Sequence, residues 1–208
     1  MTASDVAELG LRERKRRATR RAIQLAVLQL VAERGLDGVT VDEISGEADI
    51  SPRTFFNYFA SKEAALLGDP PVLSADAAIE SFVQGTGSLL DDLADLLVDA
   101  GDGILSDGDL MRLRHGILKQ YPQLFAVKMA TMRAFEEQVS EVVARRLAHD
   151  HPALADTPDA LDSKSRLVTL VAFGAMRHAW TSWASEAPAA GLGARLHDSF
   201  AELRTLFS

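Results

Sequence analysis

The chain has 208 residues, contains no cysteine and carries a formal net charge of −8. Without cysteine, the chain cannot form disulfides, thiolate metal sites or a cysteine-based redox sensor. No apolar run approaches the ~18 residues that a membrane span requires, and the N-terminus lacks a secretory pattern, so we expect a cytoplasmic protein. A chain of this length favours a small domain followed by a larger one.

The charge is unevenly distributed along the chain. Residues 1–62 hold 10 Lys/Arg and 9 Asp/Glu, a balance of +1, whereas the remainder holds 12 and 21, a balance of −9. Only Glu13 opposes a basic run that consists of Arg12, Arg14, Lys15, Arg16, Arg17, Arg20 and Arg21. A lone run of this kind is a solvated helix face about as often as it is a binding surface. Beside a nucleic-acid-binding element it favours phosphate contact.

The first expected helix spans residues 12–34. Residues 1–10 are small and polar without periodicity, and we expect them to be disordered. From Leu11 onward the apolar residues recur with helical spacing, and Gly35 is suited to end the helix.

Residues 40–62 predict two short helices joined by a tight turn, with a third helix behind them. Thr40 and Glu43 have the spacing of a capping box, which opens a helix at Val41. Ser51 is a second N-cap and is followed by a proline at the first helical position, so the next helix spans residues 52–58. Ser61 is suited to cap the third helix. This pattern is a helix-turn-helix.

The side chains of the second of these helices divide into two faces. Phe55 and Phe59 point inward by helical spacing, and Arg53 and Asn57 point outward, flanked by a threonine and by Phe56. An arginine fork matches guanine O6 and N7, an asparagine amide matches adenine N6 and N7, and a ring edge can touch a thymine methyl group. The helix is therefore predicted to enter a major groove.

The stretch TVDEISGEADISPRTFFNYFASKE resembles the DNA-binding module of the TetR family of bacterial transcriptional repressors. The resemblance covers roughly fifty residues, from about Thr19 to Leu67. Gly46 departs from the usual alanine, at a cost of ~1 kcal/mol in helix stability. Asp49 replaces the usual turn glycine, and aspartate is among the few residues that tolerate the left-handed conformation.

The resemblance implies a set of DNA contacts. Arg17, Thr40, Tyr58 and Lys62 are expected to reach phosphate oxygens, and Arg53 and Asn57 to read bases. The full predicted DNA-binding set is Arg17, Thr40, Ser51, Pro52, Arg53, Thr54, Phe56, Asn57, Tyr58 and Lys62.

The rest of the chain is predicted to be helical. Gly68, Asp69 and two prolines end the fourth helix and mark a boundary between an N-terminal head, residues 1–67, and a C-terminal body, residues 68–208. In the body, helices are expected over residues 74–84, 88–100, 109–120, 124–148, 161–185 and 192–206, with loops over 101–108 and 152–158. The expected fold is all-α with about nine helices.

The last two predicted helices suggest a homodimer. The first is apolar around much of its circumference and the second has one apolar stripe, so the pair requires further neighbours. In the TetR family such helices pair with their copies in a four-helix bundle. The predicted dimer interface comprises Phe173, Met176, Trp180, Trp183, Leu196, Phe200 and Leu203.

The family resemblance also implies a small-molecule cavity in the body. Its candidate lining residues are Phe82, Met111, His115, Phe125, Met129, Met132 and His178, with Phe135 nearby. Core filling requires the same residue types at the same spacing, so the sequence alone does not separate the two interpretations. The expected effector is a small apolar or amphipathic molecule.

The sequence gives little support to catalysis or to metal binding. His149, Asp150 and His151 lie at a polar helix end with no third ligand nearby, and no cofactor motif is present, so we predict neither a metal nor a cofactor. The prediction is a dimeric repressor, not an enzyme, that binds a palindromic DNA operator and is released by a ligand. The alternatives are a ligand-independent dimeric regulator and a DNA-acting enzyme that uses acids such as Asp91, Asp92 or Asp95.

Overall fold

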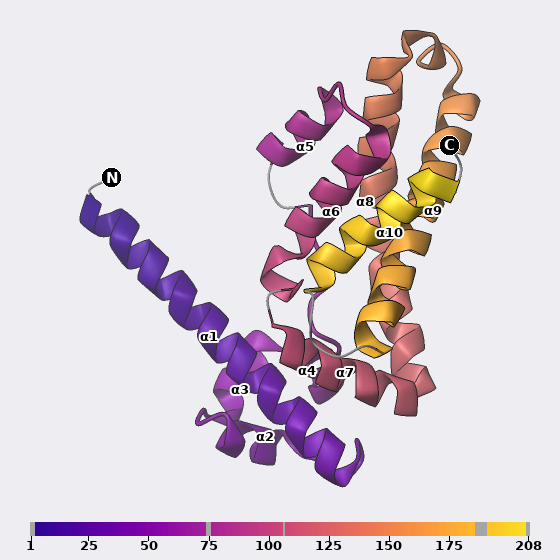
Figure 1. Cartoon of the computed structure of the whole chain (residues 1–208). Helices are drawn as coiled ribbons and strands as arrows, with labels where there is room; N and C mark the ends of the chain where they lie inside the picture. The colour runs from indigo at the N-terminus through magenta and orange to yellow at the C-terminus, as the bar shows by residue number, and fades with distance from the viewer. Residues whose placement is uncertain (1–2, 74–75, 106, 186–190, 207–208) are drawn as a thin grey trace. The chain divides into compact units, whose positions relative to one another are not determined.

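The computed structural model describes residues 3–73, 76–105, 107–185 and 191–206 (Figure 1). Within these ranges the chain forms ten α-helices and one short 3₁₀-helix and contains no strand, which confirms the all-α fold. The sequence predicted about nine helices. The chain divides into two compact units: Met1–Asp69 with Asp109–Ala126, and Pro70–Gly108 with Val127–Ser208.

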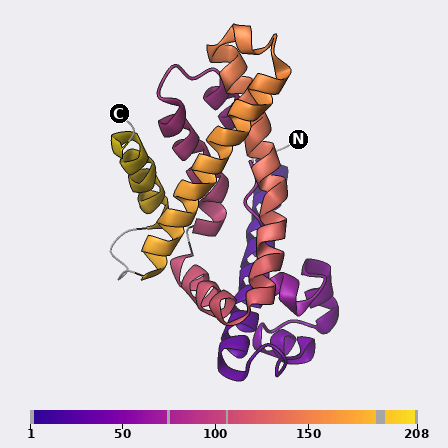
Figure 2. The same cartoon turned by 90° about the vertical axis from the view of Figure 1, so that its right-hand side faces the viewer.

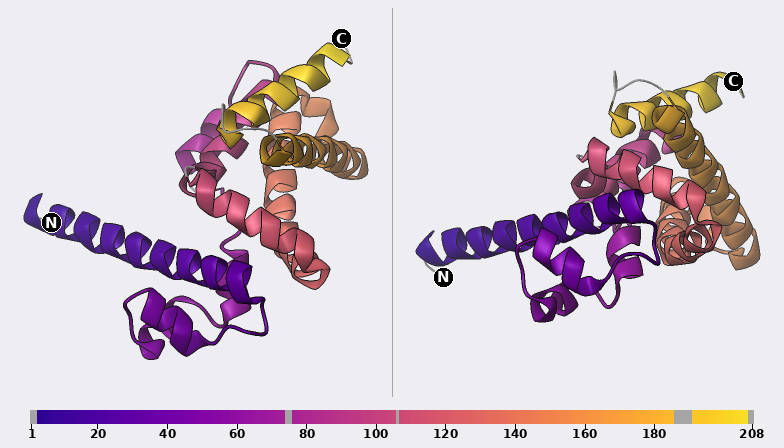
Figure 3. Two further views of the ribbon diagram at one scale, coloured as in Figure 1. Left: turned by 60° about the horizontal axis from the view of Figure 1, so that its bottom comes forward. Right: turned by 90° about the horizontal axis from the view of Figure 1, so that it is seen from below.

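The first unit is built on one long helix. Helix α1 (Ala3–Arg34) packs against α2 (Val41–Glu47) and α4 (Lys62–Leu67), and α3 (Pro52–Tyr58) follows α2 (Figure 3). Their core is apolar and fully enclosed, with Ile23, Val27, Ile44, Phe55 and Leu66 all inaccessible to solvent. Burial of this core holds the short helices α2–α4 in place, because helices of this length are not stable alone.

Helix α1 begins earlier than the sequence predicted. It starts at Ala3, so residues 3–10, which were expected to be disordered, are helical; residues 1 and 2 lie outside the described residues. The basic run that follows is itself helical, and extending an existing helix requires no new nucleation. The absence of an apolar stripe in residues 3–10 therefore misled the prediction, since such a stripe reports tertiary packing and not helicity.

The first unit includes a segment that the sequence assigned to the body. Helix α7 (Gly108–Gln120) and the first turn of α8 (Pro122–Asp150) contribute Leu110, Ile117, Leu118 and Leu124 to the same core cluster as Ile23 and Phe55. The predicted boundary at residue 68 followed the order of the chain. The packing instead joins two separate stretches of sequence into one unit.

The second unit consists of α5 (Asp76–Val83), α6 (Leu89–Leu105), the remainder of α8, the 3₁₀ turn (Pro152–Leu154), α9 (Pro158–Ser185) and α10 (Leu192–Leu206). Helices α8 and α9 leave the turn between them at an angle and diverge towards their other ends (Figure 2), and the rings of Phe135 and Phe173 are 5.8 Å apart. Helix α10 packs against both α9 and α6.

Arg146 of α8 organises one end of the second unit. Its side chain is only 1% exposed, and its guanidinium donates to the carboxylates of Asp92 and Asp150 and to the carbonyl oxygens of Phe82 and Gly87, at 2.5–3.1 Å. Four acceptors, from α5, the α5–α6 connection, α6 and α8, compensate for burial of the charge. The hydrogen bond from Arg146 lowers the pKa of Asp150. Burial acts to lower the pKa of Arg146, but the hydrogen bonds to Asp150 and Asp92 outweigh it and raise that pKa.

Helix α6 also extends beyond its prediction. It continues to Leu105, through glycine- and aspartate-rich residues that the sequence assigned to a loop over 101–108. Glycine lowers helix propensity by only about 1 kcal/mol, which tertiary packing overrides. None of the helices in the described ranges is both long enough and apolar enough to cross a membrane.

Candidate nucleic-acid interface

The caps predicted around α2 and α3 are confirmed. The Thr40 hydroxyl accepts from the Glu43 N–H at 3.3 Å, and the Glu43 carboxylate accepts from the Thr40 N–H at 2.9 Å, which closes the capping box. The hydrogen bonds that the Thr40 N–H and the Thr40 hydroxyl donate to the Glu43 carboxylate lower the pKa of Glu43. The Ser51 hydroxyl accepts from the Thr54 N–H, and Pro52 occupies the first position of α3. Helix α3 therefore begins and ends where the sequence predicted.

Helix α3 buries one face and exposes the other, as predicted. Phe55 is fully buried and Phe59 nearly so, and their rings lie 6.1 Å apart. Phe56, in contrast, is 57% exposed, and Arg53 and Asn57 are exposed beside it. The buried rings fix the rotation of the helix, so the arginine, the asparagine and the exposed ring face outward.

The turn between α2 and α3 uses a strained residue at the expected place. Asp49 has φ 52°, in the left-handed region, and is the one non-glycine residue with positive φ among those described. The short polar side chain of aspartate lowers the energetic cost of this conformation. Ala48 caps α2, and Ile50 packs against the core, so the turn sets the entry of the chain into α3.

Two basic residues of the head point inward. Lys62 donates to the carbonyl oxygens of Leu36 at 2.7 Å and Val39 at 2.8 Å, and so ties α4 to the α1–α2 connection. Arg20 forms a two-pronged ion pair with Asp69 and donates to the Tyr58 carbonyl oxygen at 2.9 Å; its guanidinium also lies 4.1 Å from the centre of the Phe59 ring. For Lys62 this differs from the expected phosphate contact, because two of its three donors are already used.

The other predicted phosphate contacts lie on the surface. Arg17 is exposed and pairs with Glu13 at 3.1 Å, one turn away on α1. Residues 11–18 are all exposed, so most of the basic run lies outside the core of the first unit. Thr40 is exposed, although its hydroxyl caps α2, and Tyr58 is half-buried. Their contacts with DNA stay predictions.

Comparison with known proteins places this head in a family. The family profile for bacterial regulatory proteins of the tetR family matches residues 25–67. The HTH-type transcriptional regulator TcmR of Streptomyces glaucescens is 31% identical over 146 residues, which cover 66% of this chain and 64% of TcmR. MftR of Mycobacterium tuberculosis, named for the regulation of mycofactocin biosynthesis, is 32% identical over 138 residues, 64% of this chain and 68% of MftR. The chain belongs to the TetR family of transcriptional regulators.

A solved structure supports the same fold at lower sequence similarity. The fatty acid degradation regulator FadR from Bacillus halodurans matches 88% of this chain and 96% of its own chain with a TM-score of 0.52, at 18% identity. The likeness of fold therefore covers helices of the body as well as the head that the sequence motif identified.

The seven residues predicted to line a ligand cavity are divided between the two units. Met111, His115 and Phe125 belong to the first unit, and Phe82, Met129, Met132 and His178 to the second. Phe82 and Met111 are buried, His115 and Met132 are half-buried, and Phe125, Met129 and His178 are exposed. Burial lowers the pKa of His115. The His178 ring is hydrogen-bonded to the Ser199 hydroxyl at 2.9 Å.

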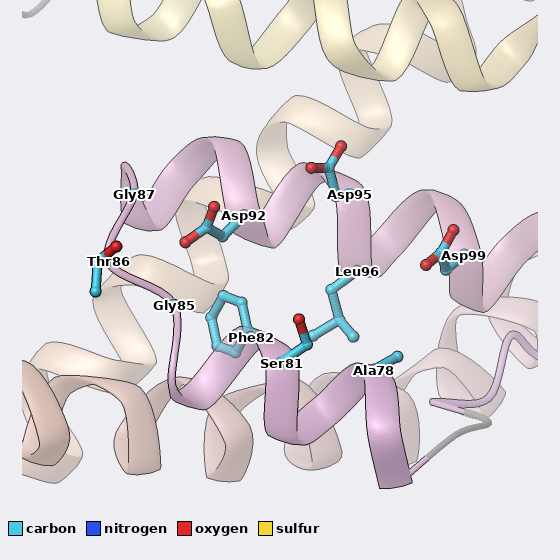
Figure 4. Close-up of a pocket in the computed structure, with 10 residues that line it drawn as sticks. All are labelled: Ala78, Ser81, Phe82, Gly85, Thr86, Gly87, Asp92, Asp95, Leu96 and Asp99. Atoms are coloured by element: carbon cyan, nitrogen blue, oxygen red, sulfur yellow. The ribbon is translucent and has the colours of Figure 1, made fainter.

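An open cleft in the second unit includes a predicted lining residue. It lies between α5 and α6 and has a volume of about 240 Å³ (Figure 4). The side chains of Phe82 and Leu96 lie between the two helices, and Asp92, Asp95 and Asp99 follow one side of α6. Two of these carboxylates are already paired, Asp92 with Arg146 and Asp95 with His197. Sequence spacing could have found the acidic stripe, because residues 92, 95 and 99 share a helical face.

Three of the seven residues predicted for the dimer interface are internal to one chain. Trp183, Leu196 and Phe200 are buried, and Phe173, Met176, Trp180 and Leu203 are half-buried. The first three fill the space between α9, α10 and their neighbours, so they cannot present an exposed surface. The exposed apolar residues of α9 are instead Leu167, Leu170 and Val171, which sequence reasoning missed because a stripe facing the core and a stripe facing a partner look alike.

His149, near the end of α8, lies beside a carboxylate that already has a partner. His149 is hydrogen-bonded to Asp150 at 3.3 Å, and Asp150 is held by Arg146. Among the described residues, no group of three or more histidine, aspartate or glutamate side chains is arranged to hold a metal ion.

Proposed function

We propose that this TetR-family regulator is a repressor that binds a palindromic DNA operator as a homodimer and is released by a small molecule. The observation that carries the proposal is the outward face of α3. Arg53, Phe56 and Asn57 are exposed on a helix whose rotation is fixed by the buried rings of Phe55 and Phe59.

The outward face has the chemistry of a base-reading surface. The side chains of Arg53 and Asn57 make no hydrogen bond or ion pair with any residue in the described part of the chain, so both are available to a base edge. An arginine on guanine and an asparagine on adenine each contribute about 1–3 kcal/mol of discrimination against the wrong base. Such contacts require a major groove wide enough to admit α3.

Phosphate contact is proposed for the exposed basic side chains of α1. Within the described part of the chain, Arg17 pairs only with Glu13, across an exposed helical turn, and such pairs contribute little to stability. The pair can therefore be exchanged for a phosphate at small cost. Because the second part of the chain is acidic and would repel DNA, the basic run directs docking to the first unit.

The homodimer is proposed to use the exposed face of α9. Leu167, Leu170, Val171 and Gly174 lie on one face of this helix, and nothing in the described structure lies within 4 Å of where a Gly174 side chain would begin. A helix surface that includes a glycine allows close approach of a second helix. In a symmetric dimer the same patch would meet its own copy.

We propose that a ligand bound in the body releases the regulator from DNA, because the binding of ligand and the binding of DNA are thermodynamically coupled. A small molecule that favours a spacing of the two heads incompatible with the operator must lower DNA affinity, and DNA must lower its affinity equally. The cleft beside Phe82 is one candidate location. Its volume lies below the roughly 300–1,000 Å³ typical of small-molecule pockets, so binding would require it to open.

The proposal is tested by selecting binding sites from random duplex DNA with the full-length protein. We expect a palindrome bound by two chains, and we expect Arg53→Ala to lose about 1–3 kcal/mol per half-site on that DNA and to relax the preference at one base pair. Arg133→Ala, which removes an exposed arginine of α8, is the matched control and should bind normally. Selection of no palindrome would refute the proposed operator. If Arg53→Ala weakens binding to all DNA equally, Arg53 contacts phosphate and does not read bases.

A further inference from the structure

Two side chains from α7 and its C-terminal end meet the head at its two left-handed glycines. Gly35, after α1, has φ 78°, and Gly68, after α4, has φ 67°; they are the positive-φ glycines of the described chain. A side chain at Gly35 would begin 3.3 Å from the Tyr121 hydroxyl oxygen, and one at Gly68 would begin 2.8 Å from the Arg114 guanidinium. At both points glycine therefore permits a turn and a close approach at once.

Arg114 fixes α7 to the end of α4. Its side chain is buried, and its Nε–H donates to the Leu66 carbonyl oxygen at 2.7 Å. That carbonyl lies in the last turn of α4, where backbone oxygens have no partner within the helix and a positive charge is favourable. The guanidinium thus caps α4 with a directional bond that depends on the absence of a side chain at Gly68.

Tyr121 fixes the other end of α7 to the α1–α2 connection. Its hydroxyl oxygen accepts from the Leu36 N–H at 3.0 Å. Lys62 holds the same connection through the carbonyl oxygens of Leu36 and Val39. The connection that leads into the helix-turn-helix is therefore bound to α4 by Lys62 and to the start of α8 by Tyr121.

Two directional contacts restrict what apolar packing alone permits. Tyr121 follows Arg114 by seven residues, which places their backbones roughly 10 Å apart along the helix. Between them Ile117 and Leu118 pack into the head core, but apolar contacts have no preferred direction and tolerate small rotations. A single hydrogen bond would leave the head free to rotate about one point. Two separated hydrogen bonds restrict that rotation. Together they set the orientation of the head on α7.

We propose that Arg114 and Tyr121 are positioning residues that set which spacing of operator half-sites the regulator accepts. The reasoning rests on the proposed function, because half-site spacing has meaning only for a dimer on a palindrome. Helix α8 is continuous from Pro122 to Asp150, with its first turn in the first unit and the remainder in the second unit. A head held rigidly on α7 and on that first turn accepts one spacing, and a loosened head accepts several.

The first test compares DNA affinities over a series of operators. Tyr121→Phe removes only the hydroxyl group and Arg114→Met removes the guanidinium; both are made singly and together, with Lys119→Met on the exposed side of α7 as the control. The operators differ by one or two base pairs at their centre, each of which shifts the half-sites by about 3.4 Å. We expect wild type and control to lose at least ~10-fold in affinity away from the best spacing, and the double variant to lose about fivefold less than they do.

The same series of operators can also overturn the proposal. If the variants bind every spacing more weakly by one common factor, Arg114 and Tyr121 support folding and do not select spacing. Failure of the wild-type protein to bind any paired half-sites would refute the proposed function instead, and a second readout then still decides this inference.

The second readout needs neither operator nor ligand. Because the chain contains no cysteine, Glu47→Cys on α2 and Glu137→Cys on α8 give two unique sites for spin labels, both at exposed positions. Labelled chains are diluted with unlabelled wild type so that distances are measured within one chain. We expect a narrow distance distribution in the wild-type background and a broader one with Tyr121→Phe and Arg114→Met. Equal widths in both backgrounds would overturn the proposal.

Discussion

Lys62 illustrates how a residue in a known motif can have a role that the motif does not indicate. Its ammonium group donates to the carbonyl oxygens of Leu36 and Val39, which precede it by 26 and 23 residues. Those oxygens belong to the connection between α1 and α2, outside the hydrogen-bond pattern of either helix. A lysine in this position stabilises the route of the chain into α2. Contact with a phosphate would have to use its one remaining donor.

This role predicts that Lys62→Met lowers stability more than it changes DNA binding. The variant keeps the aliphatic part of the side chain and leaves two carbonyl oxygens without their charged donor, so we expect a loss of about 1–3 kcal/mol in the free energy of unfolding. Urea denaturation measures it. The dependence of DNA affinity on salt is expected to stay unchanged, whereas loss of a phosphate contact would reduce the slope by ~0.9 per contact, or ~1.8 for a symmetric dimer.

The residues that the sequence predicted well are those whose partners lie within a few positions. Thr40, Ser51 and Asp49 were identified because caps and turns depend on local spacing. Arg20 and Tyr121 were not, since their partners lie 49 and 85 residues away. A hydrogen bond between distant segments leaves no periodic trace in the sequence, and neither residue type is unusual at its position.

At the scale of elements, α10 is fastened to α6 by two ion pairs. His197 pairs with Asp95 at 2.8 Å, and Arg204 pairs with Asp91. The two pairs run in opposite order along the helices, so they hold α10 antiparallel to α6. The other ring nitrogen of His197 lies 3.1 Å from the Gly193 carbonyl oxygen, so both ring nitrogens face acceptors. The doubly protonated, charged ring satisfies both.

This geometry predicts a pH dependence of stability. The hydrogen bond to Asp95, together with the Gly193 carbonyl and the charge of Asp198, raises the pKa of His197, although burial opposes the shift. Because the folded-state pKa lies above the unfolded value of about 6.5, the contribution of His197 is complete below that pH and is lost as pH rises through the folded-state pKa. Denaturation of wild type and His197→Gln across this range measures it, and the difference between them should shrink as pH rises. A constant difference would contradict the prediction.

Helix boundaries were predictable where they depend on local chemistry. Helix α3 occupies residues 52–58 and α10 residues 192–206 as expected, because a cap or a clean apolar stripe marks each. The start of α1 and the end of α6 were wrong, since both extend through residues without such marks. The attachment of α7 to the head was also missed. Its apolar stripe predicts a helix with a buried face but does not say which core buries it.

At the scale of the whole molecule, the apolar surface of the second unit distinguishes core from interface. The sequence assigned Trp183, Leu196 and Phe200 to a dimer interface, but all three are buried within one chain. The residues left exposed on α9 are Leu167, Leu170 and Val171. Burial is thus the information that the sequence lacked, because hydrophobic periodicity reports a covered face without identifying what covers it.

Substitution by glutamate is expected to have different effects at the exposed apolar residues of α9 and at the residues buried within one chain. Leu170 is 53% exposed, so Leu170→Glu should leave the folded chain intact but place a glutamate opposite its own copy in the proposed symmetric dimer, where desolvation and like-charge repulsion oppose association. We expect sedimentation to show monomers at micromolar concentration and helical content to stay unchanged. Val72→Glu, also at an exposed apolar position, is the control and should stay dimeric.

Trp183→Glu is the informative contrast. Trp183 is 4% exposed and its ring lies 5.7 Å from that of Trp180, so the substitution buries an unpaired charge and removes a large side chain from the core. We expect a loss of several kcal/mol in the free energy of unfolding, with dissociation only as a consequence of unfolding. Urea denaturation followed by circular dichroism separates the two variants. If Leu170→Glu stays dimeric at micromolar concentration, the exposed face of α9 is not the interface and another surface must join the chains.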